Sequence, residues 1–134
     1  MEFFVLANGI KIPKVGMGTN TFGKEGNTYQ GEINMDTKEL IWAYQNGYRL
    51  VDTAIAYRNE AVIGKSIKES GLNRNEIFVT SKIPMRPETT ATDELIIKAM
   101  DESIDRIGSY IDLYLIHHPG DHETNLKVWR QLEF

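Results

Sequence analysis

Four residues with acid–base side chains stand at or just after the ends of short apolar runs. Asp52 ends one such run, and Tyr57 follows it by five residues. Lys82 and His117 end two later runs that are rich in branched and aromatic residues. If these runs are neighbouring parallel strands, about 4.8 Å apart, their last residues meet at one edge of a sheet. The sequence therefore predicts a candidate active site where a carboxylate, a phenol, an amine and an imidazole converge.

The elements that would position these side chains alternate along the chain. An Asn-Gly pair tolerates positive φ, so Ala7-Asn8-Gly9 predicts a tight hairpin between residues 3–6 and 10–12. A long polar loop is expected at residues 20–35. The remaining expected strands are 14–19, 50–52, 77–82 and 113–116, and the expected helices are 36–46, 59–70, 92–107 and 123–134. Strands joined by such helices run parallel, because each crossover returns the chain to the same edge, which predicts an α/β fold.

Two helices carry more specific signals. Asp36 or Thr37 is expected to cap the first of them. Apolar residues recur at helical spacing in the third, which predicts a buried stripe on one face. The stripe consists of Ile96, Met100, Ile104 and Ile107.

Composition limits the classes of protein to consider. A chain of 134 residues with 41% hydrophobic and 25% charged residues is typical of one globular domain with a modest core. A net charge of -4 without a basic cluster disfavours a nucleic-acid partner, and no apolar run is long enough to cross a membrane. The absence of cysteine excludes disulfides and thiolate metal sites. With no leader sequence either, we expect a cytoplasmic protein.

Four motifs occur in a fixed order and together resemble the aldo-keto reductase family in its bacterial form. They are Val15-Gly16-Met17-Gly18-Thr19, Asp52-Thr53-Ala54 followed by Tyr57 and Asn59-Glu60, Lys82 at a strand end, and Leu115-Ile116-His117 before Pro119. The hairpin is similar to the one that closes the bottom of that family's barrel. The resemblance implies a parallel (β/α) TIM-barrel fold. Residues 1–134 would be a single domain, the N-terminal half-barrel of four β/α units preceded by a β-hairpin and ending inside the fourth helix.

The resemblance also implies a catalytic role for each of the four residues. Tyr57 would protonate a carbonyl oxygen while a nicotinamide delivers hydride to the carbonyl carbon. A phenol is a weak acid at neutral pH, so Lys82 would favour its ionised form, and Asp52 would orient the lysine. His117 would donate a hydrogen bond to the carbonyl and position it. The implied activity is the reduction of aldehydes or ketones to alcohols with NADPH, or with NADH.

Further positions match the ligand sites of the family. Gly18 and Thr19, together with Asp52, match positions beside the nicotinamide end of the cofactor. The candidates for the substrate pocket are Phe22, Tyr29 and His118. His118 stands where the family usually has a tryptophan that helps to wall the pocket.

Each of these residues has a structural explanation when taken alone. A strand-end acid often caps a turn, and a tyrosine often packs half-buried with its hydroxyl bonded. A lysine at a strand end is commonly solvated, and a histidine after a strand is commonly a loop residue. The catalytic interpretation depends on the four occurring together and in order.

Two competing interpretations are a metal site, suggested by the histidines, and a Rossmann-type dinucleotide fold, suggested by the glycines. His117 and His118 occur in the same sequence as Asp52 and Asp121, which would suit a metal-dependent hydrolase. We expect no metal, because adjacent residues at a strand end point to different sides and the helical zinc motif is missing. The glycines at positions 16, 18 and 23 are too loosely spaced for the Rossmann fingerprint.

The sequence ends at Phe134, inside a predicted helix. The resemblance implies that the residues gripping the cofactor's carboxamide, ring and phosphates belong to a second half that is absent here. A half-barrel has two open edges and an exposed inner face, so we expect a homodimer or a completing half-barrel chain. The residues expected on that inner face are Val15, Val51, Val79 and Leu115. The alternative to a reductase is a non-catalytic half-barrel that self-associates.

Overall fold

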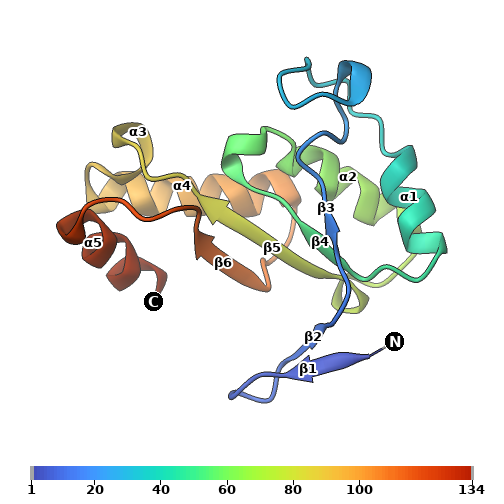
Figure 1. Cartoon of the computed structure of the whole chain (residues 1–134), viewed down its shortest axis with the longest axis horizontal. Coiled ribbons are helices and arrows are strands. Elements are labelled where there is room, and N and C mark those ends of the chain that lie inside the picture. The colour runs from blue at the N-terminus through green and yellow to red at the C-terminus, as the bar shows by residue number, and fades with distance from the viewer. Residues whose placement is uncertain (1, 134) are drawn as a thin grey trace.

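The computed structural model describes residues 2–133, which form a two-stranded hairpin and a four-stranded sheet with helices (Figure 1). The strands are β1 (Phe3–Val5), β2 (Lys11–Pro13), β3 (Met17–Gly18), β4 (Leu50–Asp52), β5 (Phe78–Ile83) and β6 (Leu113–Ile116). The helices are α1 (Lys38–Gln45), α2 (Glu60–Ser70), α3 (Pro87–Thr90), α4 (Asp93–Ile107) and α5 (His122–Leu132). Three 3-10 turns are η1 (Glu25–Asn27), η2 (Ile55–Tyr57) and η3 (Arg74–Glu76). Within the described part, no helix has the length and apolar character needed to cross a bilayer.

The larger sheet is entirely parallel, with the strand order β3-β4-β5-β6. Each of its strands is followed by at least one helix, so the four predicted β/α units are confirmed. Gly18 pairs with Asp52, and Asp52 pairs with Thr80. Because the strands are parallel and in sequence order, their C-terminal ends lie side by side along one rim.

The core lies between the sheet and the helices. Val51 and Val79 are fully buried, and they pack in one cluster with Leu40 of α1 and Ile63 of α2. A second cluster joins Ile83 of β5 to α4 and α5. The expectation that Val51 and Val79 line an exposed inner face is therefore wrong. Successive side chains of a strand point to opposite faces, so these two valines face the helices whereas Asp52, Thr80 and Lys82 share the other, concave face.

The two other residues expected on the inner face are exposed. Val15 is 61% exposed and Leu115 is 38% exposed. Leu115 pairs with Lys82, so it lies on the same concave face as the candidate site. Both buried hydrophobic clusters lie on the opposite side of the sheet, where the helices pack.

Helix α4 buries most of the expected stripe, and Met100 packs partly buried against the second cluster. Ile96 and Ile107 are buried as predicted, but Ile104 is 41% exposed. Ala99 and Ser103 take the inner positions instead. The small side chains allow α4 to lie close to its neighbours, and the Ser103 hydroxyl is hydrogen-bonded to that of Tyr114 on β6, 2.9 Å away. Apolar periodicity misses such a residue because serine is counted as polar.

Turns and helix ends follow the sequence signals with small shifts. In the hairpin only Gly9 has a positive φ, of 83°, and the Leu6 amide donates to the Ile10 carbonyl across a three-residue loop. Helix α1 begins at Lys38, after Thr37 at the cap position, and the Lys38 amide donates to the carboxylate of Asp36, the other residue predicted as a cap. Helix α5 ends at Leu132, before the expected end, and Phe134 lies outside the described residues.

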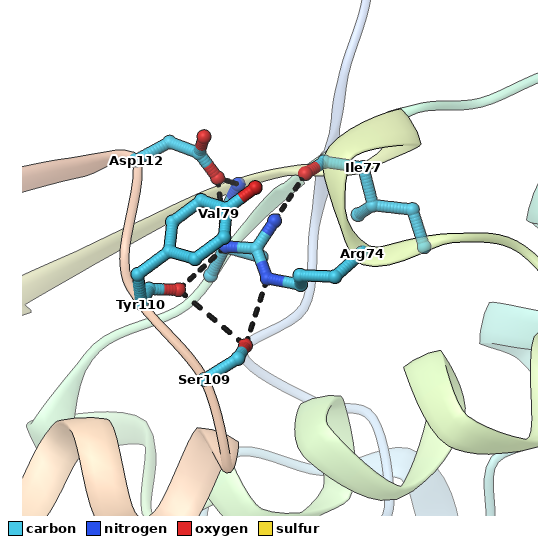
Figure 2. A network of polar contacts seen from close by, with 6 residues as sticks. All are labelled: Arg74, Ile77, Val79, Ser109, Tyr110 and Asp112. Atoms are coloured by element: carbon cyan, nitrogen blue, oxygen red, sulfur yellow. Dashed lines mark hydrogen bonds and ion pairs between the residues drawn. The ribbon is translucent and has the colours of Figure 1, made fainter.

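A polar cluster joins β5 to β6 at their N-terminal ends (Figure 2). The Arg74 guanidinium donates to the Ser109 hydroxyl at 2.8 Å, to the Tyr110 carbonyl at 2.6 Å and to the Ile77 carbonyl. It also forms an ion pair with Asp112 at 2.8 Å. The same Asp112 oxygen accepts from the backbone amide of Val79. The cluster therefore sets the start of the β5–β6 pairing, whose other end carries the candidate site.

Candidate active site

The rim at the C-terminal ends of the parallel strands brings three of the predicted residues into direct contact. Asp52 is the last residue of β4, Lys82 lies near the end of β5, and Tyr57 ends η2. The Lys82 ammonium lies 2.7 Å from a carboxylate oxygen of Asp52 and 3.3 Å from the Tyr57 hydroxyl. It also donates to the Thr53 carbonyl at 3.0 Å. All three donors of the ammonium thus have partners, which fixes its position.

Tyr57 is held so that its hydroxyl oxygen accepts from Lys82. An ammonium has no acceptor, so the phenol's own proton is left for a different acceptor. The lysine nitrogen also lies 4.8 Å from the centre of the Tyr57 ring. The arrangement places a fixed positive charge beside a phenol that has a proton to give.

His117 follows β6 directly and completes the group of four. Its backbone amide donates to Ile83 and so extends the β5–β6 ladder by one bond. Its ring meets the Tyr57 ring edge-on, with centres 5.6 Å apart. Burial lowers the pKa of His117, and the positive charge of Lys82 lowers it further, while Asp52 opposes the shift. The lowered pKa favours the neutral form of the imidazole, whose buried Nδ1 has no hydrogen-bond partner among the described residues.

The predicted cofactor positions lie beside this group. Gly18 pairs with Asp52, and a Cβ added at Gly18 would meet nothing within 4 Å, so there is open space next to the carboxylate. Thr19 is fully buried, and its hydroxyl donates to the Asp52 carbonyl at 2.8 Å. The Thr19 side chain thus holds β3 to β4.

The three predicted pocket residues have different environments. Tyr29 is 40% exposed, and its ring meets the Tyr57 ring edge-on at 6.1 Å. The ring of His118 lies 5.7 Å from that of His117. Phe22 packs against the core cluster around α1 and α2. The geometry thus places Tyr29 and His118 at the rim, and Phe22 in the packing beneath the loop.

Asn59 is a supporting residue that appeared in the sequence only as part of a motif. It is fully buried, and its side-chain amide donates to the carbonyls of Thr19 and Phe22 at 2.6 and 3.2 Å. Its oxygen accepts from the Thr53 hydroxyl at 2.6 Å. Asn59 therefore ties the loop after β3 to the loop that carries Tyr57. Its sequence signals were its place in the motif and its position at the start of the expected helix 59–70.

Glu60, the next residue, anchors the sheet to α4. Its carboxylate is buried and accepts from the Ser81 hydroxyl at 2.6 Å and from Arg106 at 2.8 Å. Ser81 lies between Thr80 and Lys82 on β5 and points to the helix side. Glu60 and Arg106 thus anchor β5 at Ser81, directly before Lys82. No local pattern links Glu60 with Arg106, because they are far apart in the sequence.

Within residues 2–133, no group of three or more His, Cys, Asp or Glu side chains converges as a metal site. His117 and His118 lie side by side, but the Asp121 carboxylate accepts from the amide and hydroxyl of Thr124 at the start of α5. These hydrogen bonds lower the pKa of Asp121. The residues singled out for a hydrolase therefore have separate roles.

Most of the chain matches known proteins. The chain is 39% identical over 129 residues to a glyoxal reductase of Bacillus subtilis and 35% identical over 130 residues to a morphine 6-dehydrogenase of Pseudomonas putida. Each alignment covers 96% of this chain, and 42% and 40% of those proteins respectively. A crystal structure of a Bombyx mori aldo-keto reductase in complex with NADP superposes with a TM-score of 0.78 at 30% identity.

That superposition covers 98% of this chain and 45% of the other. The chain thus spans less than half the length of the relatives that it matches, and its fold is half of their TIM barrel. The model of the aldo/keto reductase family matches residues 14–134, which include the whole parallel sheet and all four candidate catalytic residues. On this match and on the order of its strands, the chain belongs to the aldo/keto reductase family.

Proposed function

We propose that this chain carries the proton-transfer half of a carbonyl reductase that uses a nicotinamide cofactor to convert aldehydes or ketones to alcohols. The observation that carries the proposal is the position of the Lys82 ammonium, bound at once to Asp52 and to the Tyr57 hydroxyl. A surface lysine would not be held in this way, because exposed ion pairs contribute little and are rarely ordered. Here the lysine side chain is only 13% exposed.

Proton transfer follows from the contacts. A carbonyl oxygen placed next to the Tyr57 hydroxyl would receive the phenol's proton, leaving a phenolate beside Lys82. The ammonium stabilises that negative charge as it forms, and Asp52 holds the ammonium in place. His117, whose ring lies against Tyr57, would orient the carbonyl by a hydrogen bond. Tyr57 is thus the general acid. Lys82 and Asp52 set its charge environment, and His117 orients the carbonyl that receives the proton.

The residues present fit one end of a nicotinamide cofactor. The open space at Gly18, next to Asp52, would admit a flat ring beside the phenol. When bound, the cofactor supplies the hydride. Asp52, Gly18 and Thr19 would form the near wall of its site. We propose NADPH, with NADH as the second choice, because a related structure is a complex with NADP.

The alternative function is a non-catalytic half-barrel. It is favoured by one observation, that the chain covers only 40% and 42% of the two named relatives. More than half of each relative has no counterpart in these 134 residues, including whatever contacts its second half makes with the cofactor. On this alternative, the four rim residues would be retained without turnover.

Titration with NADPH separates these two functions. If the site binds cofactor, micromolar NADPH should quench the emission of Trp42 and Trp129 by energy transfer to the nicotinamide. N-acetyltryptophanamide at matched absorbance is the control for light absorbed by the nucleotide itself. A corrected emission that stays constant up to millimolar NADPH would support the inert half-barrel and remove the reductase proposal for this chain alone.

We propose further that the concave face is covered in solution, by a second copy or by a completing half-barrel. Strands β3 and β6 each have one unpaired edge among the described strands, and Leu115, Leu126 and Trp129 near the β6 edge are each at least 38% exposed. Sedimentation velocity of the chain alone is expected to show a dimer at micromolar concentration. A well-folded monomer at high concentration would contradict this prediction.

A further inference from the structure

A buried lysine lies in the loop between β3 and α1 and is not used by the mechanism above. Lys24 is 1% exposed, and no described carboxylate lies within ion-pair distance of it. Its ammonium donates to the carbonyls of Asn20 and Tyr29 at 2.8 and 2.9 Å. It also lies 4.6 Å from the centre of the Tyr29 ring. A buried charge is costly unless it is hydrogen-bonded, so these contacts must hold the loop in one conformation.

A second cation donates to the same Tyr29 carbonyl. The Arg58 guanidinium donates to the carbonyls of Tyr29 and Gly31 at 2.9 and 3.0 Å. Arg58 directly follows Tyr57 and has a left-handed backbone with φ 62°. A non-glycine residue rarely adopts this conformation, and here it ends η2 and turns the Arg58 side chain toward the loop. One residue thus links the turn that carries the phenol to the loop that carries Tyr29.

The Tyr29 ring is the part of this loop that reaches the candidate site. It meets Tyr57 edge-on, with centres 6.1 Å apart and planes at 79°. Its hydroxyl donates to the Ala56 carbonyl at 3.2 Å. The Tyr29 carbonyl is held by two cations, and the Tyr29 hydroxyl is hydrogen-bonded. The ring therefore has little freedom, although 40% of the residue is exposed.

We propose that Lys24 and Arg58 are positioning residues that together clamp the Tyr29 carbonyl and so fix the Tyr29 ring as a wall of the carbonyl-substrate pocket. The inference rests on the proposed reductase function, which it deepens by naming what shapes the pocket. The hydrogen bonds of both side chains go to backbone carbonyls of the loop and not to Asp52, Tyr57 or Lys82. Loosening the clamp therefore weakens substrate binding, equally in the ground state and the transition state, and leaves proton transfer intact.

The test compares Arg58→Asn with two further variants. Asparagine tolerates the left-handed backbone but is too short to reach the loop, so the substitution removes the clamp without straining the turn. Lys24→Met removes the other donor and keeps a similar stem. Arg58→Lys keeps a cation that can still reach a carbonyl. Arg130→Ala, at an exposed position on α5, is the matched control.

Two readouts are needed. Amide hydrogen exchange within residues 20–35 is expected to accelerate about tenfold in Arg58→Asn and Lys24→Met, with β5 amides unchanged. In these variants the loop can open with one clamping hydrogen-bond donor fewer to break, so opening costs less free energy. The KM for a carbonyl substrate is expected to rise about tenfold with kcat within about twofold of the parent chain. Arg58→Lys should restore part of both effects, and the control should change neither.

The outcomes separate the clamp from the proposed function. Unchanged exchange in the loop of both variants would overturn the clamp, as would a fall in kcat at constant KM. If the parent chain reduces no carbonyl compound, the reductase function fails. In that event the exchange rates alone decide whether the two cations hold Tyr29.

Discussion

Replacing Tyr57 with phenylalanine is expected to lower carbonyl reduction by the chain by about a hundredfold to ten-thousandfold, the range typical of a lost general acid. The phenylalanine ring would still pack edge-on against His117 and Tyr29. Lys82 would keep its bonds to Asp52 and the Thr53 carbonyl. The substitution removes the hydroxyl, and with it the transferable proton and the hydrogen bond from Lys82, so the loss should appear in kcat. The measurement is NADPH oxidation with an aldehyde such as glyoxal.

The matched control is Tyr48→Phe. Tyr48 is 38% exposed and precedes β4, at the end of the strand opposite Asp52, so it undergoes the same chemical change away from the rim. Its turnover should equal that of the parent chain. NADPH binding, followed by fluorescence, should be unchanged in both variants. A Tyr57→Phe variant with turnover within about twofold of the parent would remove the phenol from the mechanism.

Replacing Arg74 with alanine is expected to lower the free energy of unfolding by about 3 kcal/mol, which is typical of breaking a largely buried ion pair by removing one partner. The Arg74 side chain is 16% exposed and that of Asp112 is 19% exposed, so both charges are mostly removed from water. Alanine would leave the Ile77 carbonyl without its Arg74 donor and the Tyr110 carbonyl with only the long hydrogen bond from Ser109, at 3.5 Å. The effect is large for a domain of this size, whose total stability is about 5–15 kcal/mol. Urea unfolding followed by circular dichroism measures it.

Two variants sharpen this test. Arg74→Lys keeps the charge but cannot reach Ser109, Tyr110 and Asp112 at once, so it should recover only a small part of the loss. Arg130→Ala, an exposed arginine on α5, should change stability by less than about 0.5 kcal/mol. A destabilisation below about 1 kcal/mol in Arg74→Ala would show that the cluster in Figure 2 does not set the β5–β6 pairing.

Much of the fold could be predicted because its signals are local. Apolar runs ending in polar residues marked β4, β5 and β6, and helical spacing marked α2 and α4, which end at Gly71 and Gly108 with positive φ. The parallel order followed from the helices between the strands. The convergence of Asp52, Tyr57 and Lys82 then required only that neighbouring strands end at one rim.

The errors concerned which face a side chain occupies. Val51 and Val79 were assigned to the barrel interior, but they are buried under the helices. A run of three residues such as β4 has no alternation from which to read its faces, so an apolar residue fits either side. Ile104 was assigned to the core of α4 for a similar reason, since a helix with apolar residues on a broad arc does not show which edge is covered.

The sequence by itself determined the order of elements, the family and the four chemical groups at the strand ends, because each depends on residues close together in the chain. The tertiary structure alone decided what holds those groups in place. The bonds from Asn59 to Thr19, from Glu60 to Arg106 and from Arg58 to Tyr29 join residues separated by 29 or more positions. Contacts over such distances leave no periodic trace in a single sequence, and they form only once packing has brought the strands and loops together.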